Sequence, residues 1–167
     1  ILSEVAQAQS KGNGASESLS KITNVSNELV GTMSDIVWSI NPAKDHLFDL
    51  AQRMRRFASD SLSAKNIVFQ FNFSAADKDL IVNSNIRREM FLIFKEAVNN
   101  IVKHSAAKKV VITMKKSAAD LSLKIIDDGK GFAVEKSFAD SFSSIQMGGN
   151  GISSMQKRAA AMNGELI

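Results

Sequence analysis

Three short segments constrain this chain more than any other feature, because a fold that uses them together must bring distant parts of the chain to one place. Each combines polar or acidic side chains with glycine or with residues that favour a helix. In chain order they read Glu96-Ala97-Val98-Asn99-Asn100-Ile101-Val102-Lys103-His104, then Asp127-Asp128-Gly129-Lys130-Gly131-Phe132, then Gly148-Gly149-Asn150-Gly151-Ile152.

The first segment predicts a polar helix face. Glu96, Asn99, Asn100, Lys103 and His104 follow the i, i+3, i+4, i+7, i+8 spacing that places side chains on one side of an α-helix. Magnesium prefers hard oxygen ligands, so the amide oxygen of Asn100 can supply one while nucleotide phosphates supply others. Glu96 can polarise a water or an attacking group, and Lys103 can offset phosphate charge. The same pattern also fits an exposed helix face that binds nothing.

The second segment follows a predicted strand. Gly129 and Gly131 permit positive φ angles and close approach of the backbone, and Asp127 stands at the strand end. A carboxylate beside such a turn can accept a hydrogen bond from the amino group of adenine. Read alone, the segment is also compatible with an ordinary Asp-Gly turn.

The third segment precedes a predicted helix. Free backbone N–H groups at a helix start, together with the helix dipole, favour anions, so Gly149 and Gly151 suit a phosphate. A flexible loop before a helix is the alternative. The Walker pattern Gly-x-x-x-x-Gly-Lys-Ser/Thr does not occur in the sequence.

A long helix is predicted near the start of the chain, ending at Asn41-Pro42, because the residue before proline is pushed out of the α region. Its apolar side chains need a partner, either residues 1–8 or a second copy of the chain. Residues 9–16 are polar, contain two glycines and predict a loop. The heptad seam has one polar position and consists of Leu19, Ile22, Ser26, Leu29, Met33, Ile36 and Ile40.

The remaining periodicities predict an α+β fold, a two-layer α/β sandwich preceded by the helical segment. We expect Asp45 to cap the helix that follows it, and His46 to be a surface or capping residue. The residues 133–150 show no clear periodicity, which is typical of a functional loop. The expected helices span 45–64, 83–104 and 152–162, and the expected strands span 67–73, 109–115 and 121–126, the last two forming a hairpin.

Composition narrows the class of protein. With 44% hydrophobic residues in 167, a packed core is expected, and the absence of cysteine excludes disulfides and Cys-based zinc sites. No apolar run reaches the ~18 residues of a membrane span. The net charge of +4 is scattered apart from Arg53, Arg55 and Arg56, which we interpret as a solvated helix face, so no nucleic-acid partner is expected. Ile1-Leu2 and the strand-like residues 164–167 suggest a fragment of a longer protein.

The three segments together resemble the ATP-binding domain (GHKL, or Bergerat, fold) of sensor histidine kinases, type II topoisomerases, heat-shock chaperone ATPases and mismatch-repair ATPases. Glu96-x-x-x-Asn100 looks like the N box, Asp127-x-Gly129-x-Gly131 like the G1 box and Gly149-x-Gly151 like the G2 box. The segment 133–148 then looks like the ATP lid. The resemblance is strongest to sensor histidine kinases of the nitrate-sensing subgroup, through Asn100-Ile-Val-Lys-His104, Gly151-Ile-Ser-Ser-Met-Gln-Lys-Arg158 and Asp35-Ile-Val-Trp38-Ser-Ile-Asn41-Pro42.

The resemblance implies a role for each residue. ATP and Mg²⁺ are the expected cofactors: Asn100 would bind the metal, Glu96 would act as the polarising base in phosphoryl transfer, and Asp127 would read adenine. Lys103 and His104 would face the phosphates. The other residues expected in the nucleotide pocket are Asn99, Gly129, Gly131, Phe132, Gly149, Gly151 and Ile152.

The resemblance also implies the context of the chain. Residues 1–42 would be part of a dimerisation bundle, lacking the family's phosphoacceptor histidine, and 43–167 a catalytic domain cut short of its last strand. We therefore expect a homodimer through residues 15–41, a response regulator receiver domain as partner, no self-phosphorylation by this fragment, and a cytoplasmic position within an inner-membrane sensor, without membrane contact by the fragment itself. The alternatives are a chaperone- or topoisomerase-type ATPase, disfavoured because those proteins place their ATP domain first, and an inactive dimerisation scaffold.

Overall fold

The computed structural model describes residues 13–41, 45–117, 120–131 and 150–167. The chain divides into two compact units, residues 1–41 and 42–167.

The described part of the first unit forms the long helix α2 (Asn13–Ile40). Residues 13–16 belong to this helix, so the predicted loop at 9–16 is wrong there, and residues 9–12 lie outside the described part of the chain. The helix exposes much of the apolar stripe that the heptad pattern predicted: Leu29 is 59% and Met33 65% exposed. Ile22 of the stripe is also exposed, and so are Val25, Val30 and Val37, three apolar residues of the same helix outside the heptad seam.

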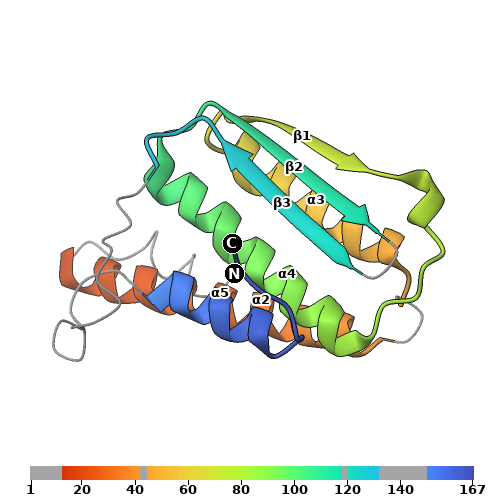
Figure 1. The fold of residues 1–167 in the computed structure, drawn as a ribbon. Coiled ribbons are helices and arrows are strands. Elements are labelled where there is room, and N and C mark those ends of the chain that lie inside the picture. Colours follow the sequence, from red (N-terminus) through yellow and green to blue (C-terminus); the bar gives the residue numbers. More distant parts are fainter. Residues whose placement is uncertain (1–12, 42–44, 118–119, 132–149) are drawn as a thin grey trace, which may run out of the picture. The chain divides into compact units, whose positions relative to one another are not determined.

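The second unit alternates helices and strands (Figure 1). In chain order its elements are α3 (Leu47–Ser63), β1 (Val68–Phe73), the short 3₁₀ turn η2 (Ala75–Asp77), α4 (Ser84–Asn100), the π-helical turn η3 (Ile101–Ser105), β2 (Lys109–Lys116), β3 (Leu121–Asp127) and α5 (Asn150–Ala160). The predicted helices and strands are therefore present, with boundaries that move by a few residues. The expected strand opening at 164–167 is wrong, because these residues have no regular structure.

The three strands form one mixed sheet in the order β1-β2-β3. Strands β2 and β3 are antiparallel, as the predicted hairpin requires, and Ile112 pairs with Ile125. Strand β1 joins the sheet parallel to β2, with Phe71 opposite Ile112. Helices lie along one side of the sheet (Figure 1), so the predicted two-layer α+β sandwich is confirmed.

The core lies between this sheet and the helices. Alternate residues of β2, Val110, Ile112 and Met114, are buried, which places them on the face that the helices cover. Leu50 and Met54 on α3, and Phe94 and Val98 on α4, are also fully buried. Phe57 of α3 packs edge-on against Phe91 and Phe94 of α4, with ring centroids 6.1 Å and 6.2 Å apart.

The start of α3 differs from the prediction. Asp45 does not cap the helix: His46 occupies the N-cap position, is exposed and makes no side-chain cap hydrogen bond. Instead, Asp45 Oδ1 lies 2.7 Å from Nη1 of Arg87, whose side chain on α4 is completely buried. A buried guanidinium requires an opposing charge, and this requirement determines where the carboxylate of Asp45 points. By contrast, α4 has a side-chain cap, since Asn83 accepts from the backbone N–H of Asn85 at 2.8 Å.

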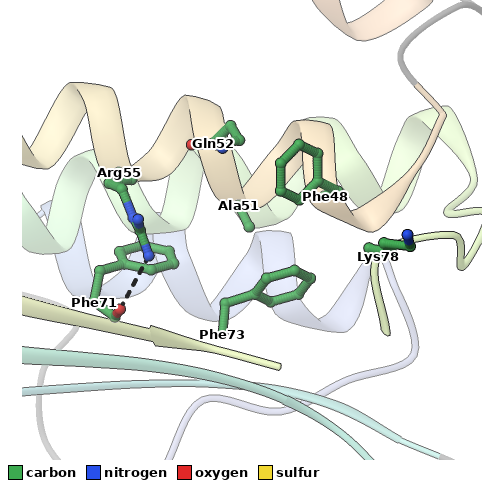
Figure 2. A pocket seen from close by; sticks show the side chains of 7 residues that line it. All are labelled: Phe48, Ala51, Gln52, Arg55, Phe71, Phe73 and Lys78. Atoms are coloured by element: carbon green, nitrogen blue, oxygen red, sulfur yellow. Dashed lines mark hydrogen bonds between the residues drawn. The ribbon is translucent and has the colours of Figure 1, made fainter. Parts of the chain in front are cut away.

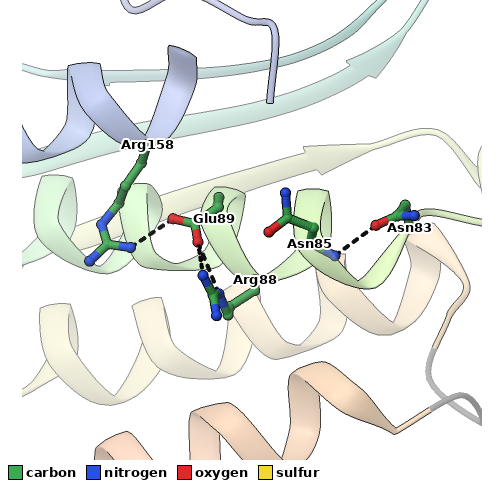
Figure 3. A network of polar contacts seen from close by, with 5 residues as sticks. All are labelled: Asn83, Asn85, Arg88, Glu89 and Arg158. Atoms are coloured by element: carbon green, nitrogen blue, oxygen red, sulfur yellow. Dashed lines mark hydrogen bonds and ion pairs between the residues drawn. The ribbon is translucent and has the colours of Figure 1, made fainter. Parts of the chain in front are cut away.

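A second charged group joins α4 to α5. Glu89 of α4 is only 4% exposed and lies between Arg88 and Arg158 (Figure 3). Its Oε1 accepts from Arg88 Nε at 2.9 Å, and its Oε2 accepts from Arg158 Nη1 at 2.7 Å. Burial disfavours the charged form of Glu89, but the hydrogen bonds and charges of the two arginines outweigh it and lower the pKa of this carboxyl. Because Arg158 belongs to α5, the ion pair holds α5 against α4.

Among the described residues, no helix combines the length and the apolar character that crossing a lipid bilayer requires.

The lowered pKa of Glu89 predicts a pH-dependent stability. The carboxyl titrates at a lower pH in the folded than in the unfolded chain, so its contribution is complete above the ordinary glutamate pKa of about 4.3 and is lost as pH falls through the lowered value. We expect Glu89→Gln to reduce the free energy of unfolding by about 1–2 kcal/mol near neutral pH. This loss is smaller than that for a fully buried ion pair, because water screens the two partly exposed arginines.

Urea unfolding, followed through the NMR amide signals of Phe94 and Met155, measures this effect in the second unit. The variant's deficit should shrink as the solution is acidified, whereas Glu165→Gln, at an exposed glutamate, should match the wild type throughout. A deficit that is equal in acid and at neutral pH would contradict the assignment.

Candidate functional site

The last turns of α4 carry the first polar segment. Glu96, Asn99 and Asn100 are half-buried there. Within the part of the chain that the structure describes, their side chains have no hydrogen-bond or ion-pair partner.

The predicted single α-helix through residue 104 is wrong in its last turn. The α-helix ends at Asn100, and Ile101–Ser105 form the π-helical turn η3, whose wider spacing breaks the i, i+3, i+4 pattern. Lys103 and His104 are exposed on this turn. Ser105 ends it, because Ser105 Oγ donates to the Ile101 carbonyl at 2.9 Å and accepts from the Ala107 N–H at 3.0 Å.

The second segment forms a tight turn after β3. Asp127 Oδ1 accepts from the Gly129 N–H at 2.9 Å, and the Lys130 N–H donates to the carbonyl of Ser105 at 2.9 Å. A Cβ on Gly129 would lie well inside 3.0 Å of the Ser105 carbonyl oxygen, so only glycine fits. Gly131 has a φ of +63°, the left-handed region that favours glycine. Phe132 lies outside the described residues.

Asp128 and Ser105 are two site-supporting residues that the sequence reasoning missed. Asp128 Oδ1 accepts from the N–H groups of Lys108 and Lys109, both at 2.8 Å, and these bonds, with Lys109 first, lower the pKa of the Asp128 carboxyl. Consecutive side chains of a strand point to opposite sides. The doubled acid Asp127-Asp128 therefore indicates only that the two carboxylates point in different directions, and the backbone partners of Asp128 are remote in the sequence. Nothing in the sequence around Ser105 marks it in this way.

The third segment meets the first. Gly151 lies in the first turn of α5, and a Cβ there would fall well inside 3.0 Å of Glu96 Oε1 and 3.6 Å from Asn100 Nδ2. The backbone of α5 therefore lies directly against the carboxylate and amide of α4. Ile152 is 38% exposed beside it. Gly149 and the segment 133–148 lie outside the described residues.

The two glycine segments thus contact one stretch of the chain. Gly151 packs on Glu96 and Asn100, while Gly129 packs on Ser105, at the end of the η3 turn that follows Asn100 directly. The stretch offers oxygen atoms of a carboxylate and an amide, and the first turn of α5 adds backbone N–H groups. Such groups suit a ligand that combines phosphates with a hard cation.

The chain was compared with protein families and with known proteins. Residues 85–167 match the family model described as histidine kinase-, DNA gyrase B-, and HSP90-like ATPase. Among curated proteins, the sensor histidine kinase LiaS of Bacillus subtilis is 32% identical over 87 residues, which cover 52% of this chain and 22% of LiaS. The sensor histidine kinase YvfT of the same organism is 34% identical over 105 residues, or 63% of this chain and 25% of YvfT.

Solved structures show the same fold. The histidine kinase AdeS of Acinetobacter baumannii aligns with 91% of this chain at a TM-score of 0.58 and 18% identity, over 75% of its own chain. A histidine kinase domain from Erythrobacter litoralis aligns with 96% of this chain and 83% of its own, at a TM-score of 0.51 and 15% identity.

The aligned region spans about a quarter of the length of the two curated relatives. The matched segment, 85–167, nevertheless includes all three of the polar and glycine-rich segments described above. Residues 85–167 therefore carry an ATPase domain of the histidine kinase, DNA gyrase B and HSP90 type, and the curated proteins that this region resembles are sensor histidine kinases.

Proposed function

We propose that this chain is the ATP-binding catalytic region of a kinase that transfers the γ-phosphoryl group of ATP to a histidine outside the chain, and from there to a response regulator. The observation that carries the proposal is the packing of Gly151 against Glu96 and Asn100. Phosphoryl transfer depends mainly on positioning and charge neutralisation, and this contact brings a carboxylate, an amide and a helix start together.

Each described residue of the site has a proposed role that follows from its chemistry. Asp127, held in its turn by the Gly129 N–H, offers a carboxylate oxygen to the adenine amino group. Glu96 polarises the attacking imidazole. The N–H groups at the start of α5 and the exposed cation of Lys103 offset phosphate charge, and His104 faces the same groups. Gly129, Gly131 and Gly151 let the backbone approach the nucleotide, while Asn99 and Ile152 complete the described part of the pocket. Phe132 and Gly149, which lie outside the described residues, are proposed as nucleotide-binding from the sequence alone.

Asn100 is the proposed magnesium ligand, and the chain's groups suit that ion. Mg²⁺ retains several waters and uses few protein ligands beside phosphate oxygens. Among the described residues no three His, Cys, Asp or Glu side chains gather into a metal site, which fits an ion held largely by the nucleotide. Bound there, Mg²⁺ would neutralise phosphate charge, and the amide oxygen of Asn100 would fix its position.

The first unit is proposed to dimerise through residues 15–41. Its exposed apolar stripe, which includes Leu29 and Met33, follows heptad spacing along α2 and is typical of a helix that packs against another copy. We expect sedimentation equilibrium to find a dimer that Leu29→Lys weakens. Lys21→Gln, at an exposed polar position of the same helix, is the control. A monomeric wild-type chain at micromolar concentration would contradict the proposal.

The kinase is favoured over the other members of this ATPase family because the curated relatives are named sensor histidine kinases. An inactive scaffold is disfavoured by the retained Glu96, Asn100 and Asp127. The phosphoacceptor is proposed to lie outside this chain, since His46 is the N-cap residue of α3 and His104 belongs to the η3 turn. We place the domain in the cytoplasm, as part of a membrane-anchored sensor.

Substituting Asn100 tests the metal site. Asn100→Asp places a negative charge beside the triphosphate, whose negative charges outnumber the two positive charges of Mg²⁺. We expect the affinity for ATP in excess Mg²⁺ to fall by about ten-fold or more. Isothermal titration with ATP, in excess Mg²⁺ and in a chelator, measures the affinity with and without the metal.

Asn85→Asp is the matched control. Asn85 is exposed on the same helix, about 22 Å away at 1.5 Å per residue, and a negative charge is favourable in a first helical turn. It should leave both titrations unchanged. If Asn100→Asp also leaves them unchanged while the wild type binds ATP, Asn100 is not the metal ligand.

A further inference from the structure

A pocket separate from the three segments lies between α3 and the edge strand β1 (Figure 2). Its volume is about 180 Å³. A cavity of about 150 Å³ can hold one benzene ring, so this pocket has room for one aromatic ring with a small substituent. It is lined by Phe48, Ala51, Gln52, Arg55, Phe71, Phe73 and Lys78.

The floor of the pocket is aromatic. Phe48 of α3 and Phe73 of β1 approach with ring centroids 6.5 Å apart and planes inclined at 47°. Ala51 carries only a methyl group between them and Arg55 along α3, which leaves the space open (Figure 2). Phe48 remains 45% exposed although its ring lies beside that of Phe73. A third aromatic ring can pack against the two tilted rings.

The charge of the pocket is entirely positive. Arg55 and Lys78 line it, and its seven lining residues include no carboxylate. Arg55 is held in place: its Nη2 donates to the Phe71 carbonyl at 3.2 Å, and its guanidinium lies 5.4 Å from the centroid of the Phe71 ring. A guanidinium has five N–H donors, so this arrangement leaves donors for a carboxylate.

The same arginine argues against a peptide strand as the occupant. In the described sheet β1 pairs only with β2, so its other side is an edge. The Val68 N–H donates to the carbonyl of Lys108, the residue before β2. Alternation along the strand therefore turns the Phe71 carbonyl to the outer edge. The Phe71 carbonyl already accepts a hydrogen bond from Arg55, and an added strand would need the same carbonyl as its acceptor. A small ligand avoids the conflict.

We propose that this pocket binds a small aromatic carboxylate. The ring lies against Phe48 and Phe73, and the carboxylate pairs with the guanidinium of Arg55, within the field of Lys78. The site is independent of nucleotide binding, because none of its lining residues belongs to the three segments.

An NMR titration of the isotope-labelled 167-residue chain with phenylacetate tests the site. The backbone amide signals of Ala51, Gln52, Phe71 and Phe73 should shift saturably. Benzylamine, which has the same ring and the opposite charge, should leave them in place because it meets two cations. Equal responses to both compounds, or phenylacetate shifts confined to other residues, would overturn the proposal.

Two neighbouring arginines provide a matched pair of variants. Arg55→Gln should raise the dissociation constant of phenylacetate about five-fold, the scale of a partly exposed ion pair. Arg56→Gln removes the same charge from the next residue of α3, which is exposed and does not line the pocket, and should change the constant little. Equal effects of the two variants would reduce the site to nonspecific charge attraction and overturn it.

The amide spectrum shows whether each variant remains folded. Should Arg55→Gln unfold, Lys78→Gln replaces it, since Lys78 lies in the turn after η2 and its side chain can change without disturbing α3. Weaker phenylacetate binding to Lys78→Gln supports the site, and unchanged binding contradicts it.

Discussion

The close packing of α5 on α4 is the constraint on which the site depends. A side chain at Gly151 would displace the carboxylate of Glu96, which lies against the Gly151 backbone beside Asn100. This approach needs α5 to be held along α4, and the buried Glu89, paired with Arg158, provides that hold (Figure 3). The site therefore depends at once on Gly151, on the Glu89–Arg158 ion pair and on the polar face of α4. Any substitution that moves α5 outward separates the groups that the proposed chemistry requires to be adjacent.

Much of this architecture could be predicted from the sequence, because local patterns carried it. Apolar spacing located α3, α4 and α5, and alternation located the strands and the β2–β3 hairpin. The parallel pairing of β1 was not predictable, since either direction places the same half-buried phenylalanines on one face of the sheet. Asp45 was misassigned as a cap because its real partner, Arg87, is remote in the sequence. The π-helical turn was not predicted, because the sequence of Ile101–Ser105 has the periodicity of an ordinary α-helix.

The same distinction applies to the site. Residue types and their order were enough to predict the candidate side chains of the site. The structure places Gly151 against Glu96 and Asn100, and Gly129 against Ser105. The support around them was invisible in the sequence, because Ser105 and Asp128 act through backbone groups of partners that only the fold brings near. The ligands of Asn100 and Asp127 stay predictions. The aromatic pocket between α3 and β1 could not be predicted from the sequence either. Its Arg55 belongs to the group Arg53, Arg55 and Arg56, which the sequence predicts to be a solvated helix face.

The central claim is that three remote segments surround one ATP molecule. The most direct measurement is an NMR titration of the chain with ATP in excess Mg²⁺, following the amide signals of Asn100, Gly129 and Gly151. The account predicts that all three shift with one shared dissociation constant while Val68 and Asn72, on the edge strand, stay still. Different dissociation constants for the three signals, or a response in only one segment, would contradict it.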